Sequence, residues 1–291
     1  MAQVRGRAGH GPCGAKGPDP LWTMWWLVIP VGLYCFRKQI AQRLAPVLPT
    51  LEPQKAVFYG HLVTVFSTLL YIIPLELLGL SVVKRLAYMS SLWSVILTSM
   101  LAIKANYGAP PMPENLSFSN FRQVLTTTMQ PWLEKALMGV DFHFLFFALI
   151  FVTAYPSVPA LVILGRHRLW AVCTYCTKNN AQSRLWLMFA PTWAKLKAME
   201  KQVLAYSALG EIALAFWLTV SLFLPTRQII PCILYWNYLK TRYQVPRSHE
   251  LHKQAWSSLG QKVEPVFKAV PILRKPIDMA KGWFAPQYQT R

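Results

Sequence analysis

Long apolar runs alternate with basic segments along the chain. Two shorter apolar runs, 21–36 and 229–239, are too short to predict a membrane span and suit interfacial or re-entrant segments. The longer runs reach or approach the about 20 residues that an α-helix needs to cross the hydrocarbon core of a bilayer. They cover residues 56–80, 86–103, 142–164 and 203–224. The pattern predicts an all-α polytopic membrane protein with three or four transmembrane helices or hairpins.

Composition supports this class. Only 14% of the 291 residues are charged, yet the net charge is +19, and hydrophobic residues make up 54%. This hydrophobicity excludes a disordered polyelectrolyte, and five cysteines are too few for a disulfide-stapled secreted domain. A basic nucleic-acid binder would have the charge without the apolar runs, so we expect no nucleic-acid partner. The remaining class is an integral membrane protein with basic segments outside the membrane.

The chain divides into four parts by composition. Residues 1–20, rich in Gly, Pro and Ala, are predicted to be disordered. Residues 21–55 hold a short apolar segment and a basic linker, and Arg37-Lys38 after the apolar run favours an uncleaved anchor or interfacial helix over a cleaved signal peptide. Residues 56–245 form the transmembrane helical domain, and residues 246–291 form a basic amphipathic tail.

Two basic segments conflict over topology. Residues 165–202 carry seven Lys and Arg against one acid, and residues 225–291 carry eleven against three. The positive-inside rule assigns both to the cytosol, but a single span at 203–224 would separate them. Either residues 203–239 enter and return as a hairpin, or the first segment is held on the far side. The sequon at Asn115 would report on the intervening loop 104–141.

The tail has helical periodicity. Ser248 is expected to cap a helix that Pro265 ends, and Pro276 begins another. We expect these helices to lie in the membrane interface, although they could instead pack on the protein's own spans. The residues expected to insert are Leu251, Trp256, Leu259, Val263, Phe267, Trp283 and Phe284. Those expected to bind anionic lipid headgroups are Lys253, Lys262, Lys268, Arg274, Lys275 and Lys281.

Few residues suggest chemistry. Glu211, in the middle of an apolar run, and Glu76, near the end of another, are candidate intramembrane polar residues. We expect Glu211 to make a structural polar contact. The alternative is that the protein is a small transporter or channel-regulatory subunit that uses Glu211. The Cys173 and Cys176 pair lacks the second ligand pair of a zinc site and the βαβ context of a thioredoxin site. We expect no catalytic residues, cofactor or metal.

Several short stretches resemble the transmembrane protein 33 family, which includes fungal pore-membrane relatives. In order and spacing they cover roughly residues 56–245. They are Pro74 to Leu80, Leu149 to Pro156, Thr174 to Lys178, Glu211-Ile212 and Tyr235 with Leu239 to Tyr243. The resemblance implies a non-enzymatic, multi-pass protein of the endoplasmic reticulum and nuclear envelope with a cytosolic tail.

The predicted function combines this resemblance with the basic tail. We expect a protein that shapes or stabilises curved membrane, in the organisation of endoplasmic reticulum tubules or in nuclear pore assembly. Hydrophobic hairpins would act as wedges, and the tail would bind anionic lipids. The resemblance adds reticulon-type shaping proteins and nucleoporins as expected partners. A scaffold that recruits acidic protein partners is a further alternative.

Overall fold

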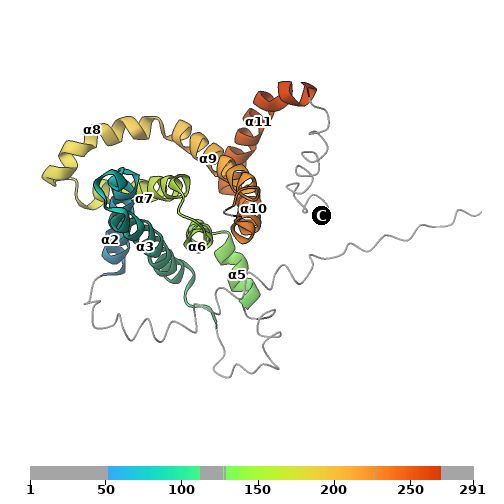
Figure 1. Cartoon of the computed structure of the whole chain (residues 1–291). Coiled ribbons are helices and arrows are strands. Elements are labelled where there is room, and N and C mark those ends of the chain that lie inside the picture. Colours follow the sequence, from blue (N-terminus) through green and yellow to red (C-terminus); the bar gives the residue numbers. More distant parts are fainter. Residues whose placement is uncertain (1–51, 112–126, 128, 226, 270–291) are drawn as a thin grey trace, which may run out of the picture. The chain divides into compact units, whose positions relative to one another are not determined.

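The computed structural model describes residues 52–111, 127, 129–225 and 227–269. The chain divides into two compact units, Met1–Glu52 and Pro53–Arg291, and the described helices all belong to the second unit. They are α2 (Pro53–Ile72), the 3₁₀-helix η1 (Leu75–Leu78), α3 (Ser81–Tyr107), α5 (Gln130–Leu137), α6 (Val140–Val152), α7 (Val158–Asn179), α8 (Arg184–Ala198), α9 (Glu200–Ser221), α10 (Ile229–Gln244) and α11 (Pro246–Ala269), as shown in Figure 1. The segments expected at 1–20 and 21–36 lie outside the described residues.

The predicted all-α class is confirmed. Three helices are long and apolar enough to cross a membrane: α2, α3 and α9. Helices α5 and α6 together would make a fourth span, bent by 90°. The described part of the chain therefore has three to four candidate membrane spans, as the sequence predicts.

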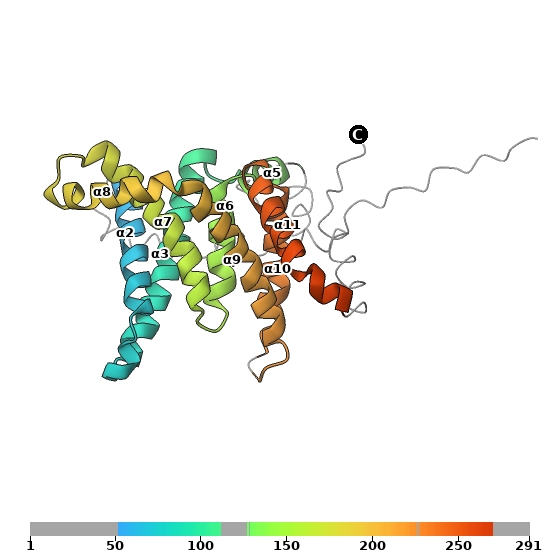
Figure 2. The ribbon, with the colours of Figure 1, turned by 90° about the horizontal axis from the view of Figure 1, so that it is seen from above.

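Six of the helices form three hairpins. Helices α2 and α3, α6 and α7, and α9 and α10 are each joined by a short turn, and Figure 2 shows these three turns at the same end of the unit. Helices α5 and α8 and the start of α11 lie at the opposite end. The hairpins pack through α2 against α7, α3 against α6, α7 against α9, and α10 against α6.

Two predicted spans are not single helices. The run 56–80 ends its helix at Ile72, and η1 then leads to Gly79, whose φ of 70° is accessible to glycine but costly for other residues. The run 142–164 is split into α6 and α7 because Pro156 and Pro159 cannot continue a helix. Pro159 instead occupies the first turn of α7, where its missing N–H is not needed.

Other boundaries also differ from the prediction. The basic segment 165–202 consists largely of helices α7, α8 and the start of α9. The run 229–239 belongs to α10, whose 16 residues return from the turn after α9. Helix α11 begins at Pro246 and continues past Pro265 to Ala269, so Pro265 does not end it. The helix expected at Pro276 lies outside the described residues.

Small and hydroxylated residues line the contact between α2 and α3. The Ser67 and Ser90 hydroxyls lie 2.8 Å apart, and Ser94 donates a hydrogen bond of 2.6 Å to the Gly60 carbonyl. A Cβ atom at Gly60 would lie 2.2 Å from the Thr98 side chain, so only glycine permits this approach. Such small residues and interhelical hydrogen bonds drive helix association inside membranes, where no hydrophobic effect operates between helices.

The third hairpin removes the conflict between the basic segments. Because α9 runs toward the hairpin turns and α10 runs back from them, α8 and the start of α11 lie at the same end of the unit (Figure 2). The positive-inside rule is then satisfied for both. Of the two alternatives that the sequence leaves open, the structure has the hairpin.

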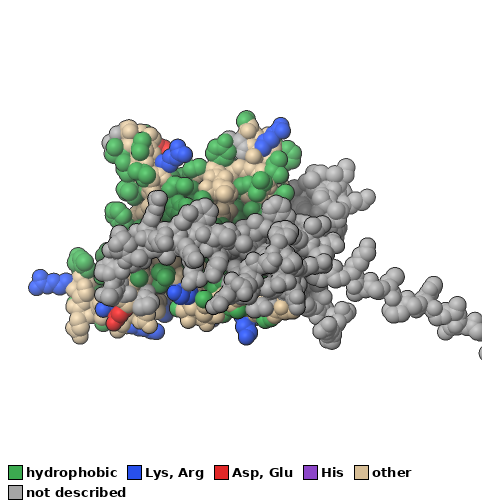
Figure 3. Space-filling view, turned by 90° about the horizontal axis from the view of Figure 1, so that it is seen from below, with side chains coloured by type: hydrophobic (Ala, Val, Ile, Leu, Met, Phe, Trp, Pro, Cys, Tyr) green, Lys and Arg blue, Asp and Glu red, His purple; other side chains and the backbone are tan. Residues whose placement is uncertain are grey.

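Hydrophobic side chains cover the projecting arms of the hairpins in Figure 3, while Lys and Arg lie at both extremities. The turns themselves expose large apolar residues, with Leu77 85% and Phe223 88% accessible. Soluble proteins rarely expose apolar surface of this extent. The arms therefore require a lipid environment. We call the end opposite the turns, which carries α5, α8 and the start of α11, the basic end, and this end requires headgroups and water.

This arrangement predicts the topology of the Asn115 sequon. The helices that flank it meet at the basic end, where the Trp132 indole donates a hydrogen bond of 3.1 Å to the Tyr107 carbonyl. Asn115 and a C-terminal tag should both face the cytosol. In microsomes, Asn115 should carry no glycan and added protease should remove the tag. A glycan at Asn115, removed by endoglycosidase H, would contradict this orientation.

Candidate functional site: a buried charged junction of α9, α10 and α11

A buried carboxylate joins the two arms of the third hairpin. Glu211 lies at the centre of α9 and is 1% exposed. The Arg242 guanidinium, on α10, donates two hydrogen bonds to it: Nη2 to Oε1 at 3.2 Å and Nε to Oε2 at 3.3 Å. This bidentate geometry is the strongest arrangement that a side-chain ion pair adopts.

The same carboxylate contacts α11. The Nε2 atom of His252 lies 3.2 Å from Glu211 Oε2, and both side chains are buried. From α10, the Tyr235 hydroxyl also donates a hydrogen bond of 3.0 Å to the Glu211 carbonyl. Glu211 thus connects three helices, and its carboxylate is held between two basic side chains. We call Glu211, Arg242 and His252 the charged junction.

Helix α11 docks on the hairpin around this junction. The Ser248 hydroxyl, expected to cap the helix, instead donates a hydrogen bond of 2.5 Å to the Arg242 carbonyl. Ala255 is buried, and the Trp256 ring lies 6.1 Å from the Phe216 ring of α9. The first half of the tail therefore packs on the protein's own helices, which is the alternative to its lying in the membrane interface.

The predicted tail residues take different positions. Leu251, Trp256 and Leu259 are half-buried, on a helix that packs against α9 and α10. Lys253 and Lys262 are exposed and remain free to meet headgroups. The remaining predicted side chains lie outside the described ones: Val263, Phe267, Lys268, Arg274, Lys275, Lys281, Trp283 and Phe284.

Aromatic residues surround the charged junction. The Arg242 guanidinium lies 5.9 Å from the Phe144 ring of α6. Tyr238 and Tyr235, both fully buried, meet the Phe147 ring edge-on at 5.3 and 5.7 Å. The junction is therefore enclosed by rings from α6 and α10, and this low-polarity surrounding strengthens the ion pair at its centre.

The sequence missed a second buried charge. Arg168, counted there among the basic residues of the 165–202 segment, is 1% exposed on α7 and donates a hydrogen bond of 2.6 Å to the Ser99 hydroxyl of α3. Its guanidinium also lies 5.6 Å from the Phe144 ring. Its spacing from the buried Leu161 and Leu164 marks it as a residue of the packed face, and this was the available signal.

The other candidates are less enclosed. Glu76 lies in η1, between α2 and α3, with 62% of its side chain exposed and Lys84 Nζ at 2.9 Å. Burial raises the pKa of the Cys173 thiol, which Cys176 raises further, and burial also raises the pKa of Cys176. Reactive cysteines have lowered pKa values, so this pair has the properties of structural thiols.

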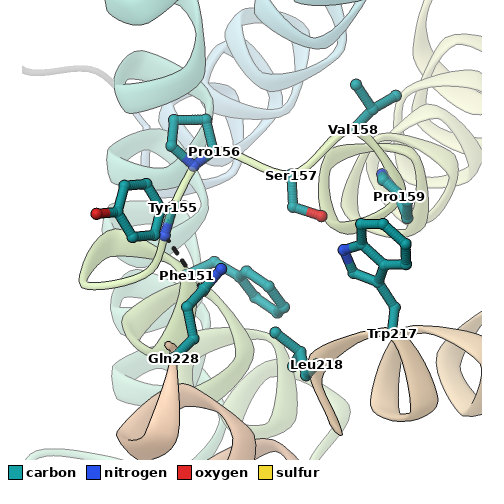
Figure 4. Close-up of a pocket in the computed structure, with 9 residues that line it drawn as sticks. All are labelled: Phe151, Tyr155, Pro156, Ser157, Val158, Pro159, Trp217, Leu218 and Gln228. Carbon is teal, nitrogen blue, oxygen red and sulfur yellow. Dashed lines mark hydrogen bonds between the residues drawn. The ribbon is translucent and has the colours of Figure 1, made fainter. Parts of the chain in front are cut away.

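A cavity of about 350 Å³ opens between the turns of the second and third hairpins. Figure 4 shows Phe151, Pro156 and Pro159 facing Trp217 and Leu218 across it. Its polar contact is a hydrogen bond of 3.3 Å from the Tyr155 backbone N–H to the Gln228 side-chain oxygen, which links the two turns.

A comparison of the sequence with protein-family models finds a match over most of the chain. The family model described as Transmembrane protein 33/Nucleoporin POM33 matches residues 41–273. The chain belongs to this family. No curated protein and no solved structure matches the chain significantly. Membership in the Transmembrane protein 33/Nucleoporin POM33 family indicates a membrane protein of the endoplasmic reticulum or nuclear pore, in agreement with the candidate spans.

The charged junction predicts a large and specific loss of stability. Glu211→Gln leaves the Arg242 charge buried without its partner, which should lower the free energy of unfolding by about 3–5 kcal/mol. An SDS titration of the full chain in mixed micelles measures this. The paired change Glu211→Leu with Arg242→Leu should recover part of the loss because no unpaired charge remains.

The matched control is Glu76→Gln, which removes the exposed carboxylate of the pair with Lys84 and should cost less than about 1 kcal/mol. Equal losses from Glu76→Gln and Glu211→Gln would show that the charged junction contributes no more than an exposed pair.

Proposed function

We propose that the protein shapes or stabilises curved membrane in endoplasmic reticulum tubules and around the nuclear pore, without enzymatic activity. The hairpins act as wedges, and the basic end binds anionic headgroups. The observation that carries the proposal is the gathering of α5, α8 and the start of α11 at the end of the unit opposite the hairpin turns. This finer role is inferred from the arrangement and dimensions of the helices, whereas the family and the membrane location rest on the comparison.

The arms differ in whether they can cross a bilayer. With 20, 27 and 22 residues, α2, α3 and α9 extend about 30, 40 and 33 Å, enough for a hydrocarbon core about 30 Å thick. The 13 residues of α6 and 16 of α10 extend about 20 and 24 Å. These two arms are too short to cross, unless the bilayer thins around them.

Helices gathered at one end of the unit add area to the two leaflets unequally. The second and third hairpins bring the cross-sections of both arms into the leaflet next to the basic end, where α5 and α8 add further cross-section, so this leaflet holds more protein than the far one. A leaflet that gains area relative to its partner bends the bilayer, so a row of such hairpins favours a curved membrane. The docked α11 adds further bulk at the same end.

The basic end supplies the electrostatic part of the proposal. Lys253 and Lys262 on α11 are exposed, and we propose that they bind anionic headgroups, at about 1 kcal/mol for each basic residue near a charged surface. We propose that Trp283 and Phe284, in the distal part of the tail, insert into the membrane interface, as the sequence predicts. Reticulon-type shaping proteins and nucleoporins are the protein partners that we propose.

Reconstitution tests the proposal. The full chain in liposomes of endoplasmic reticulum lipid composition should convert them into narrow tubules visible by electron microscopy. Phe223→Ser with Ile230→Ser removes exposed apolar surface from the third turn and should reduce the tubulated fraction severalfold. The matched control is Met138→Ser with Met199→Ser, which changes exposed residues outside the hairpin arms.

The control pair should tubulate like the unchanged protein. Vesicles that stay spherical at every protein-to-lipid ratio, while flotation shows that the chain has inserted, would contradict the proposal.

A further inference from the structure

We propose that α8 is a second lipid-binding element, an interfacial helix that lies in the headgroup region beside the hairpins. Leu185 and Phe189 would enter the acyl boundary, while Arg184, Lys195 and Lys197 would meet anionic headgroups. This inference rests on the membrane location of the family and not on the curvature proposed above.

The first half of α8 exposes large apolar side chains. Leu185 is 72% accessible, Met188 74% and Phe189 64%. Leu185 and Phe189 are four residues apart and so lie on one side of the helix. With Leu187, which is 58% accessible, four such residues within five positions form an apolar surface that a helix facing water would not present.

The second half of α8 is anchored to the bundle. Trp193 is buried and meets the Trp170 ring of α7 edge-on at 4.9 Å, and Lys197 Nζ lies 5.9 Å from the Trp193 ring. The Trp170 indole in turn donates a hydrogen bond of 3.2 Å to Glu200 at the start of α9. Pro191, which cannot donate the next helical hydrogen bond, separates this anchored half from the exposed half.

The charge around α8 selects an anionic partner. Arg184, Lys195 and Lys197 lie on the helix itself, and residues 165–199 contain no Asp or Glu. The acid that follows, Glu200, accepts the hydrogen bond from Trp170. A basic helix that exposes large apolar residues is typical of a segment that lies on an anionic membrane surface.

The position of α8 fits the same partner. In Figure 2, α8 runs crosswise to α2, α3 and α7 at the end of the unit away from the hairpin turns, and Figure 1 shows it at the periphery. The arms of α2 and α3 enter the membrane, so a helix lying across their basic end is at the level of the headgroups. A lipid surface is therefore already adjacent to the exposed residues of α8.

Photocrosslinking in the full chain tests this inference. A benzoylphenylalanine replaces Phe189, or in a second protein the exposed Ala194, which helical spacing places on the opposite side from Leu185. Both proteins are reconstituted in phosphatidylcholine vesicles with one-fifth phosphatidylserine, and each lipid in turn carries a clickable acyl chain. The position of Phe189 should give at least fivefold more lipid adduct than that of Ala194.

Lys195→Gln with Lys197→Gln should reduce the phosphatidylserine adduct at position 189 severalfold and leave the phosphatidylcholine adduct unchanged. Equal lipid adducts at both positions, or an adduct at position 189 with the mass of a second protein chain, would overturn the inference. Because adducts form in vesicles of any curvature, a failure here is separate from a failure to form tubules.

Discussion

A carboxylate buried in a membrane helix must have a partner, and this constraint organises the third hairpin. Glu211 cannot be left alone in α9, since an unpaired charge there costs several kcal/mol. Its bidentate partner, Arg242, fixes the position of α10 against α9, and His252 brings α11 to the same point. One acid thus determines how the chain returns from the turn and where the tail begins.

The position of the first part of the tail, α11, depends on that junction. The side of α11 that bears His252 and Ala255 is buried against the hairpin, so this side of the helix is not available to insert into a membrane interface. The exposed apolar surface on the basic end is found instead on α8, around Leu185 and Phe189. The lipid-binding role that the sequence predicts for the tail alone is therefore one that we propose for α8 as well.

Sequence periodicity was sufficient for the class and the main apolar runs, because each depends on local composition, and it singled out Glu211 as an acid within an apolar run. Periodicity did not predict the helix boundaries that proline sets. At Pro156, for example, one apolar run is divided into α6 and α7. Periodicity could not pair Glu211 with Arg242, since 31 residues separate them and Arg242 looks like an ordinary basic residue in its own window. Arg168 was misplaced because a charge was assumed to be solvated, although its spacing matched the buried face.

Hydrogen–deuterium exchange of α11 in the full chain tests the charged junction most directly. Amides of residues 248–256 should exchange slowly in the unchanged protein and much faster in Glu211→Gln, while α2 and α3 stay protected because their contact is made by other residues. Rapid exchange of α11 in the unchanged protein, or no effect of Glu211→Gln, would contradict the claim that this junction holds the tail to the hairpin.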